Sequence, residues 1–271
     1  MKVLILNLDQ SHERLKHQIQ QAQALGLDWE RLPAVSVSDI DDETYRRLAL
    51  SWQRPLKTTE LACFLSHKKA WELVKKRNQP MLILEDDAVL AYDIAEILQE
   101  FHNLTEVDFI NLETYNRHKI LTRTPSQILK NHRYQLYRLG IDRSGAAGYV
   151  LYPRGARKLL DYLHQRPIGL ADEFINDCEA LYAFQIEPAA VIQSNLCEHF
   201  GIIPPAVHQS IIYHLAPKRP APQSALAFWA YKYRRIKAQI YLFIKRLKYP
   251  TYIKRPIQVR PEDFKPLPPE V

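Results

Sequence analysis

Apolar and polar positions along this chain fall into segments that have, in turn, the periods of strands and of helices. Short apolar runs predict strands, and apolar positions that recur every three or four residues predict helices. The predicted strands are residues 3–8, 29–37, 81–84, 107–112, 146–152 and 184–192. Predicted helices begin at Ser11, Thr58, Ala95 and Pro153, and a last one spans residues 229–247. This alternation favours an α/β fold around a mainly parallel central sheet.

Two segments interrupt the alternation and divide the chain. Residues 114–135 are polar and weakly periodic, which predicts a long loop. Residues 217–222 are rich in proline, which is typical of a linker. We therefore expect an enzyme-like domain over residues 1–216 and a separate, basic C-terminal segment over residues 217–271.

The composition narrows the class of protein. With 46% hydrophobic and 25% charged residues, the chain has enough apolar surface to fold as a globular protein. Three widely spaced cysteines, Cys63, Cys178 and Cys197, argue against a disulfide framework and fit a reducing compartment. No apolar run has the length of a signal peptide or of a membrane-spanning helix. We expect a cytoplasmic protein in which Cys63 is a small buried apolar residue.

The net charge of +7 is concentrated near the C-terminus. Residues 199–261 contain twelve basic and no acidic residues, whereas residues 1–198 contain 24 basic and 27 acidic residues. Within residues 229–247 apolar and aromatic residues recur at helical spacing between the cations, which fits the surface of an anionic membrane. The alternative is a helix that packs on its own domain or on a second subunit, as in a homodimer. Nucleic-acid binding is less favoured, because no recognised motif accompanies the charge.

An acidic triplet, Glu85, Asp86 and Asp87, directly follows the apolar run of residues 81–84. In open α/β sheets, ligands bind beyond the carboxyl ends of strands. Side chains alternate along an extended chain, so Glu85 and Asp87 would point to one side, where their charges call for a cation. Mn²⁺ and Mg²⁺ prefer carboxylate and phosphate oxygens, so we expect one of them at Glu85 and Asp87. The alternatives are a solvated turn or a cap for the next helix.

Several segments, taken in order, carry a resemblance to a known family. They are residues 5–9 with Arg14, residues 59–67 with Trp71, residues 82–87, and residues 146–151 with residues 155–156 and 159–160. Over roughly residues 1–200 the chain resembles glycosyltransferase family 25, which holds bacterial lipooligosaccharide galactosyltransferases and collagen galactosyltransferases. The resemblance implies a GT-A-like nucleotide-sugar-binding fold, a UDP-sugar donor and inversion at the anomeric carbon. Thr59 stands where many relatives have glycine, and this departure and the basic segment leave the acceptor open.

The resemblance also implies roles for individual residues. The acidic triplet resembles the family's counterpart of the DxD motif. Inverting transfer needs a base for the acceptor hydroxyl, and Asp172 with Glu173 lies where family members carry an acidic residue. The alternative for both is a helix N-terminus, where acidic residues are favoured. The donor-binding candidates are Asn7, Asp9, Arg14, Ser66, His67, Glu85, Asp86 and Glu113.

Histidines and one tryptophan complete the candidate residues. His67 is expected either to bind the donor or its metal, or to pack as a satisfied histidine. Trp71 is expected in the core, four residues further along the same helix. His199 and His208 are weaker candidates for a late metal ligand.

Together these features predict an inverting hexosyltransferase. It would move a hexose, with galactose favoured, from a UDP-sugar to a lipooligosaccharide or lipopolysaccharide acceptor on the inner face of a bacterial inner membrane. Two alternatives stay open: a glycoside hydrolase that uses paired carboxylates, and a basic membrane- or nucleic-acid-binding module with an inactive enzyme-like core.

Overall fold

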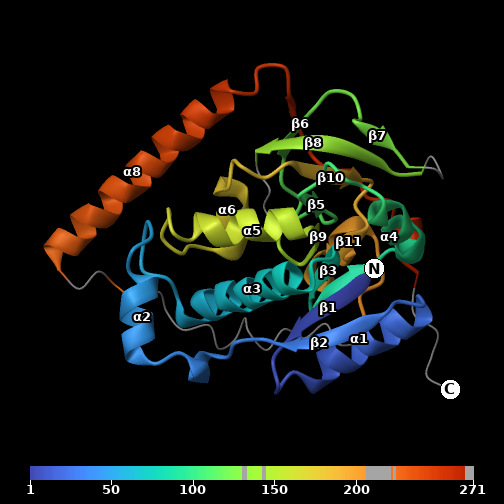
Figure 1. The fold of residues 1–271 in the computed structure, drawn as a ribbon, viewed down its shortest axis with the longest axis horizontal. Helices are drawn as coiled ribbons and strands as arrows, with labels where there is room; N and C mark the ends of the chain where they lie inside the picture. Colours follow the sequence, from blue (N-terminus) through green and yellow to red (C-terminus); the bar gives the residue numbers. More distant parts are fainter. Residues whose placement is uncertain (130–132, 142–144, 206–220, 222–223, 266–271) are drawn as a thin grey trace.

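A computed structural model of the protein describes residues 1–129, 133–141, 145–205, 221 and 224–265. A ten-stranded sheet runs through its centre, and a separate pair of strands lies beside it (Figure 1). The strands are β1 (Lys2–Asn7), β2 (Trp29–Pro33), β3 (Met81–Glu85), β4 (Ala88–Leu90), β5 (Phe109–Asn111), β6 (Lys119–Leu121), β7 (Gln127–Ile128), β8 (Gln135–Ile141), β9 (Gly148–Leu151), β10 (Ala183–Glu187), β11 (Val191–Gln193) and β12 (Ile253–Arg255). The helices are α1 (His12–Ala24), α2 (Asp42–Ala49), α3 (Thr58–Arg77), α4 (Ile94–His102), α5 (Pro153–Tyr162), α6 (Ala171–Asp177) and α8 (Ala225–Leu247).

Most strands of the large sheet run in one direction. Their order is β12-β6-β8-β10-β5-β9-β3-β1-β2, with β7 paired to β8. β1 is parallel to β2 and to β3, β5 is parallel to β10, and β9 lies antiparallel between β3 and β5. Following the antiparallel pairs outward through β8, β6 and β12 gives seven of the ten strands with the same direction. The predicted α/β class with a mainly parallel sheet is confirmed.

The central strands are buried on both faces, which explains their uninterrupted apolar sequence. In β1, Leu4 and Leu6 face a core beneath α3, α5 and α6, whereas Val3 and Ile5 face a second core beneath α1 and α4. Trp71 lies in the first of these cores, as predicted. Burying one such aliphatic side chain stabilises the fold by about 1.5–3 kcal/mol. Because β1 and β3 bury side chains in both cores, the cores hold these strands, and therefore their ends, in place.

Helix α3 carries two residues of the later argument, and its limits follow from local chemistry. Glu60 accepts a hydrogen bond at 2.9 Å from the backbone N–H of Lys57, which satisfies a free donor at the helix start. Asn78 ends the helix in the left-handed conformation, with φ of 51°. Residues four apart lie on one side of a helix, so Cys63 and His67 share a face.

Several sequence predictions need correction. Residues 114–135 are not one loop, because they contain β6 and β7, strands too short to show a period. The predicted strand at residues 184–192 is two strands, β10 and β11, in different sheets. The strand predicted for residues 29–37 ends at Pro33, and α2 was not predicted.

The C-terminal segment forms the predicted helix and then returns to the sheet. α8 spans 23 residues and lies along one flank of the molecule, near α2 and α6 (Figure 1). Beyond it, β12 pairs with β6. Ile257 is part of the core beneath α3, α5 and α6, and Phe264 is part of the core beneath α1 and α4. The proposed division at residue 216 stays a prediction, and residues 217–222 lie outside the described residues except for residue 221. No helix in the described ranges is long and apolar enough to span a bilayer.

Gly155 provides a test of the packing between α5 and the sheet. A Cβ at this position would lie 2.2 Å from the backbone oxygen of Asp108. We expect Gly155→Ala to lower the free energy of unfolding by about 1–3 kcal/mol, because rigid backbone must move. Urea denaturation measures this change. The exposed Arg157→Ala on the same helix is the control and should change stability by no more than about 0.5 kcal/mol; equal effects would contradict the packing.

Candidate functional site

A cavity of about 760 Å³ opens where β1 and β3 end. Its wall combines the end of β1, the loop at residues 34–38, one face of α3 and the acidic triplet. The lining residues are Leu6, Leu8, Gln10, Ser11, Arg14, Ala34, Val35, Ser36, Val37, Ser38, Thr59, Ala62, Cys63, Ser66, His67, Glu85, Asp86, Asp87, Tyr115, Gln193 and Asn195. A larger hollow of about 1040 Å³ lies between α2, α3 and α5, but it lacks a cluster of carboxylates. The chemistry therefore points to the smaller cavity.

The first two acids of the triplet have different partners. Glu85 Oε1 lies 3.1 Å from His67 Nε2 and 3.9 Å from Cys63 Sγ. Asp86 turns the other way, where Asn7 donates to it at 2.8 Å and Arg14 at 2.9 Å. The charge of Asp86 is thus already balanced by Arg14; Asn7 holds the end of β1, and Arg14 the start of α1, against the triplet.

Asp87 is the acid whose charge is not balanced. Its Oδ1 is buried without a hydrogen-bond partner. Burial raises the pKa of Asp87 to about 7, and the charges of Glu85 and Asp86 add to this rise. A carboxyl group in such a place is stabilised either by a bound cation, when it is ionised, or by a proton, which removes its charge. Asp87 therefore offers a free oxygen to a positively charged ligand.

Glu113 lies behind this cluster, and its charge is only partly balanced, by Lys119. Its side chain is fully buried, and neither carboxylate oxygen makes a hydrogen bond of ordinary geometry. Burial raises the pKa of Glu113 well above its ordinary value; Lys119 opposes the rise, and the charge of Glu85 adds to it. Gly145 makes room for this carboxylate, because a Cβ there would lie 1.7 Å from Glu113 Oε1.

His67 is buried, and its ring orientation is fixed from behind. Its Nδ1 lies 2.9 Å from the hydroxyl of Tyr149, and Trp71 Nε1 donates to the same hydroxyl at 2.9 Å. The other ring nitrogen, Nε2, faces Glu85. Both predicted roles meet here, because His67 is packed in the core and also faces the cavity.

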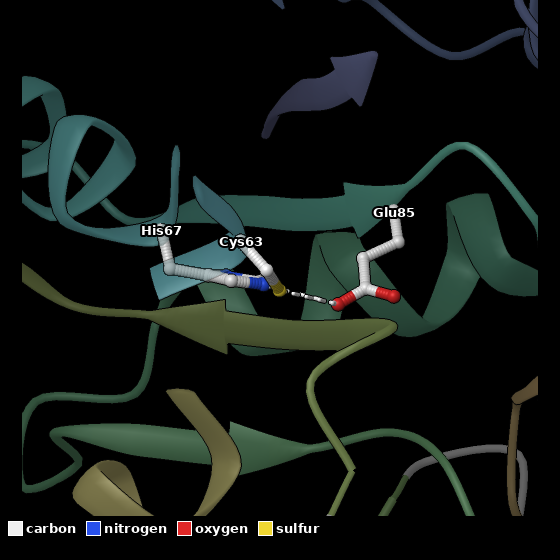
Figure 2. Close-up of side chains that lie close together, drawn as sticks. All are labelled: Cys63, His67 and Glu85. Atoms are coloured by element: carbon white, nitrogen blue, oxygen red, sulfur yellow. Dashed lines mark hydrogen bonds and ion pairs between the residues drawn. The ribbon is translucent and has the colours of Figure 1, made fainter. Parts of the chain in front are cut away.

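Cys63 is not the buried apolar residue that the sequence predicted. It is exposed at the wall of the cavity, because α3 turns it toward the end of β3. Its Sγ, a ring nitrogen of His67 and a carboxylate oxygen of Glu85 lie within 4.8 Å of one another (Figure 2). In the described part of the chain, this is the one group of three such ligands at metal-binding distance. Neither Asp87 nor Glu113 belongs to it.

The remaining donor-binding candidates divide into two groups. The hydroxyl of Ser66 accepts from the backbone N–H of Val35 and donates to the oxygen of Ala62, both at 2.8 Å, so it fixes the cavity wall. Asp9 does not line the cavity; its side chain is 82% exposed and pairs with Arg31. Sequence reasoning missed Tyr115, Gln193 and Asn195, which reach the cavity from segments without any local motif.

The two acids proposed as catalytic are consecutive residues in the first turn of α6, but their surroundings differ. Burial raises the pKa of Asp172 above its ordinary value, and the charge of Glu85 adds to this, whereas Arg117 opposes it. Asp172 therefore lies near enough for its charge to interact with that of Glu85, although it does not line the cavity. Glu173 instead accepts a hydrogen bond at 2.7 Å from Gln53 and lines a second cavity of about 640 Å³ beneath α8. Burial raises the pKa of Glu173 to about 8.

The two late histidines do not reach the site in the described structure. His199 is exposed, packs edge-on against Phe200 and does not line the cavity. His208 lies outside the described residues.

The fold and this site define an α/β protein with an acidic ligand cavity at the carboxyl ends of its strands. Residues 1–175 match the profile of glycosyltransferase family 25 (LPS biosynthesis protein). Since the profile spans more than half of the chain, this protein belongs to that family. The resemblance inferred from the sequence motifs is thereby confirmed.

Curated relatives agree with the family assignment. A Haemophilus influenzae protein described as a glycosyltransferase is 25% identical over 172 residues, which are 62% of this chain and 59% of that protein. The chain thus spans less than two thirds of the length of that relative. The lacto-N-neotetraose biosynthesis glycosyltransferase LgtE of Neisseria gonorrhoeae is 25% identical over 205 residues, 70% of this chain and 72% of that protein.

Solved structures add little. Mouse xyloside xylosyltransferase 1 covers 65% of this chain and 80% of its own with 12% identity and a TM-score of 0.33. A similarity of this size informs neither fold nor substrate.

The buried charge of Asp87 predicts a dependence of stability on pH. Its pKa is higher in the folded protein than the ordinary 3.8, so the folded state loses stability as pH rises from about 4 to 7. We expect Asp87→Asn to stabilise the protein by about 2–4 kcal/mol near pH 8 and by much less near pH 5. Urea denaturation in the presence of a chelator measures both values. Asp161→Asn, at an exposed position, should show no such pH dependence, and a pH-independent gain at Asp87 would contradict the assignment.

Proposed function

We propose that this protein is an inverting hexosyltransferase that moves a hexose, with galactose favoured, from a UDP-sugar to a lipooligosaccharide or lipopolysaccharide acceptor. Family membership supports the transferase class. The observation that carries the proposal is the partnerless oxygen of Asp87 in a cavity of about 760 Å³ at the end of β3. That volume lies within the range of small-molecule sites, and the site faces the edge where nucleotides bind in open sheets.

The residues present fit a hard divalent cation. Glu85 and Asp87 line the cavity, and the charges of both raise the pKa of the buried Glu113 behind them. Mn²⁺ or Mg²⁺ would be held by Glu85 and Asp87, as the sequence predicted, and Asp86 would stay paired with Arg14. When bound, the ion supplies charge stabilisation for the diphosphate leaving group.

The wall opposite the triplet supports a nucleotide site in a GT-A-like fold. Residues 34–38 follow β2 and are held to α3 by the bond from Val35 N–H to Ser66. Arg14 reaches the same cavity and is kept in place by Asp86. In the proposed complex, the base and ribose lie at the end of β1, and Arg14 adds positive charge near the diphosphate.

Asp172 is our candidate for the catalytic base. It would accept the proton of the acceptor hydroxyl as that oxygen attacks the anomeric carbon. Burial raises the pKa of this carboxyl, which makes it a better base than an exposed aspartate. Arg117 lies close enough for its charge to lower that pKa, so it opposes part of the rise that burial causes.

Activity assays of two neighbouring variants test this function. We expect release of UDP from UDP-galactose to need both Mn²⁺ or Mg²⁺ and an oligosaccharide acceptor. Asp172→Asn should lower kcat by about 10²–10⁴-fold, because proton removal is lost. Glu173→Gln, which faces the other cavity, should lower it by less than about tenfold. Equal losses would contradict the choice of base, and sugar release without acceptor would indicate the hydrolase alternative.

Helix α8 supports a place at a membrane surface. Its inner face is polar: Tyr231 and Arg234 donate to the backbone oxygen of Leu50, and Lys245 donates to that of Asn176. Its outer face mixes exposed cations with exposed large apolar residues; the large apolar residues there and at the helix start are Leu226, Phe228, Trp229, Tyr233, Ile236, Ile240, Phe243, Ile244 and Leu247. A helix with this orientation leaves its apolar side without a protein partner in the described chain.

We propose that an anionic bilayer covers this outer face. α8 contains six basic and no acidic residues, so negative charge complements it. Each cation near such a surface contributes about 1 kcal/mol of binding free energy, and each buried large side chain about 1.5–3 kcal/mol. A homodimer through the same face is less favoured, because it would bring two strongly positive helices together.

A charge placed on the outer face tests membrane binding. We expect Ile240→Glu to weaken binding to phosphatidylglycerol vesicles by at least about tenfold, since it loses apolar contact and adds repulsion. Vesicle flotation measures this. Ile128→Glu is the matched control, because Ile128 is 51% exposed and Ile240 is 54% exposed. Equal binding of both variants, or a dimer that needs Ile240, would contradict the proposal.

A further inference from the structure

A second set of ligands shares Glu85 but has a different chemical character. Cys63, His67 and Glu85 bring one thiol, one imidazole and one carboxylate to the same point in the cavity wall (Figure 2). Mg²⁺ and Mn²⁺ prefer oxygen ligands, whereas thiolate and imidazole suit Zn²⁺ and related soft ions. The cavity therefore contains a hard and a soft set of ligands around one shared carboxylate.

Two of the three separations between these ligand atoms lie near those of a tetrahedral ion, and all three atoms lie within 4.8 Å of one another. Zinc bonds of about 2.0–2.3 Å place neighbouring tetrahedral ligand atoms about 3.3–3.6 Å apart. Glu85 Oε1 lies 3.1 Å from His67 Nε2 and 3.9 Å from Cys63 Sγ. Shifts of a few tenths of an ångström would bring these two distances into the range. Cys63 is exposed to the cavity, so the fourth position is open to water.

His67 is held in the way that metal-binding histidines commonly are. The hydroxyl oxygen of Tyr149 accepts a hydrogen bond from Trp71 Nε1, and it has a second lone pair for a proton on His67 Nδ1. When the proton is on Nδ1, the lone pair of Nε2 is directed at Glu85 and Cys63. A partner on the far ring nitrogen of this kind orients the ring and strengthens the metal bond.

We propose that Cys63, His67 and Glu85 bind a thiophilic divalent ion such as Zn²⁺ or Cd²⁺. Cys63 binds as a thiolate, and its proton passes to solvent when the ion binds. Because Glu85 cannot serve both ions fully, Zn²⁺ opposes the Mn²⁺ or Mg²⁺ that the transferase reaction needs. This last consequence, inhibition by zinc, rests on the proposed function; the binding of the soft ion does not.

A cadmium titration tests binding without any turnover. Cd²⁺ added to the full chain should produce the ultraviolet charge-transfer band of a cadmium–thiolate bond, saturating at one equivalent. Cys63→Ala should lack the band, whereas Cys178→Ala, which removes a buried thiol elsewhere, should keep it. Tyr149→Phe should weaken Cd²⁺ affinity by about 10–100-fold, because the ring of His67 loses its partner. Circular dichroism checks that each variant is folded.

Two results would overturn the site: no band in the wild-type chain, or a band of unchanged size in folded Cys63→Ala. The inhibition is tested separately, with each variant compared with its own Mn²⁺-supported rate. We expect Cys63→Ala to need at least about tenfold more Zn²⁺ for half inhibition. Equal zinc sensitivity would overturn the competition for Glu85. A chain without transferase activity would refute the proposed function, while the cadmium band would still decide the metal site.

Discussion

Repulsion between carboxylates at the end of β3 is the constraint on which the site depends. Burial raises the pKa of Asp87 and of Glu113, and the charge of Glu85 adds to both rises. A fold keeps such a cluster only where the surrounding structure is rigid. Here the two cores hold β3 between β1 and β9, Arg14 forms an ion pair with Asp86, and Asn7 donates a hydrogen bond to it. In this cluster, the buried carboxylate oxygens without a hydrogen-bond partner belong to Asp87, which lines the cavity, and to Glu113, which is buried behind it.

The same constraint explains why three consecutive acids have three different environments. Alternation along the strand turns Asp86 toward α1 and leaves Glu85 on the side of α3. Glu85 thus meets both the hard oxygen cluster and the pair formed by Cys63 and His67. One residue thereby connects the proposed reaction chemistry with the proposed soft-metal site.

The sequence was sufficient for features that depend on local pattern. The apolar run of β3, the acids after it and the position of Trp71 all follow from periodicity, and the structure agrees with each. The sequence was insufficient for features that depend on packing between residues far apart in the chain. Nothing local distinguishes Asp9, which points to solvent, from Asn7, which braces Asp86. Cys63 is exposed because of where β3 ends, which the sequence around Cys63 does not show. Its spacing of four residues from His67, however, did indicate that the two side chains share one face of the helix.

Helix α8 shows a further limit of pattern. The sequence predicted an apolar face and a basic face, but the orientation of those faces depends on residues far away in the chain. Arg234 and Lys245 face inward because the backbone oxygens of Leu50, Trp52 and Asn176 accept hydrogen bonds from them, whereas the other four cations of the helix are exposed. A main-chain oxygen is present whichever amino acid occupies a position. The docking of α8 therefore depends on the path of the main chain at positions 50, 52 and 176, and not directly on which side chains these positions carry.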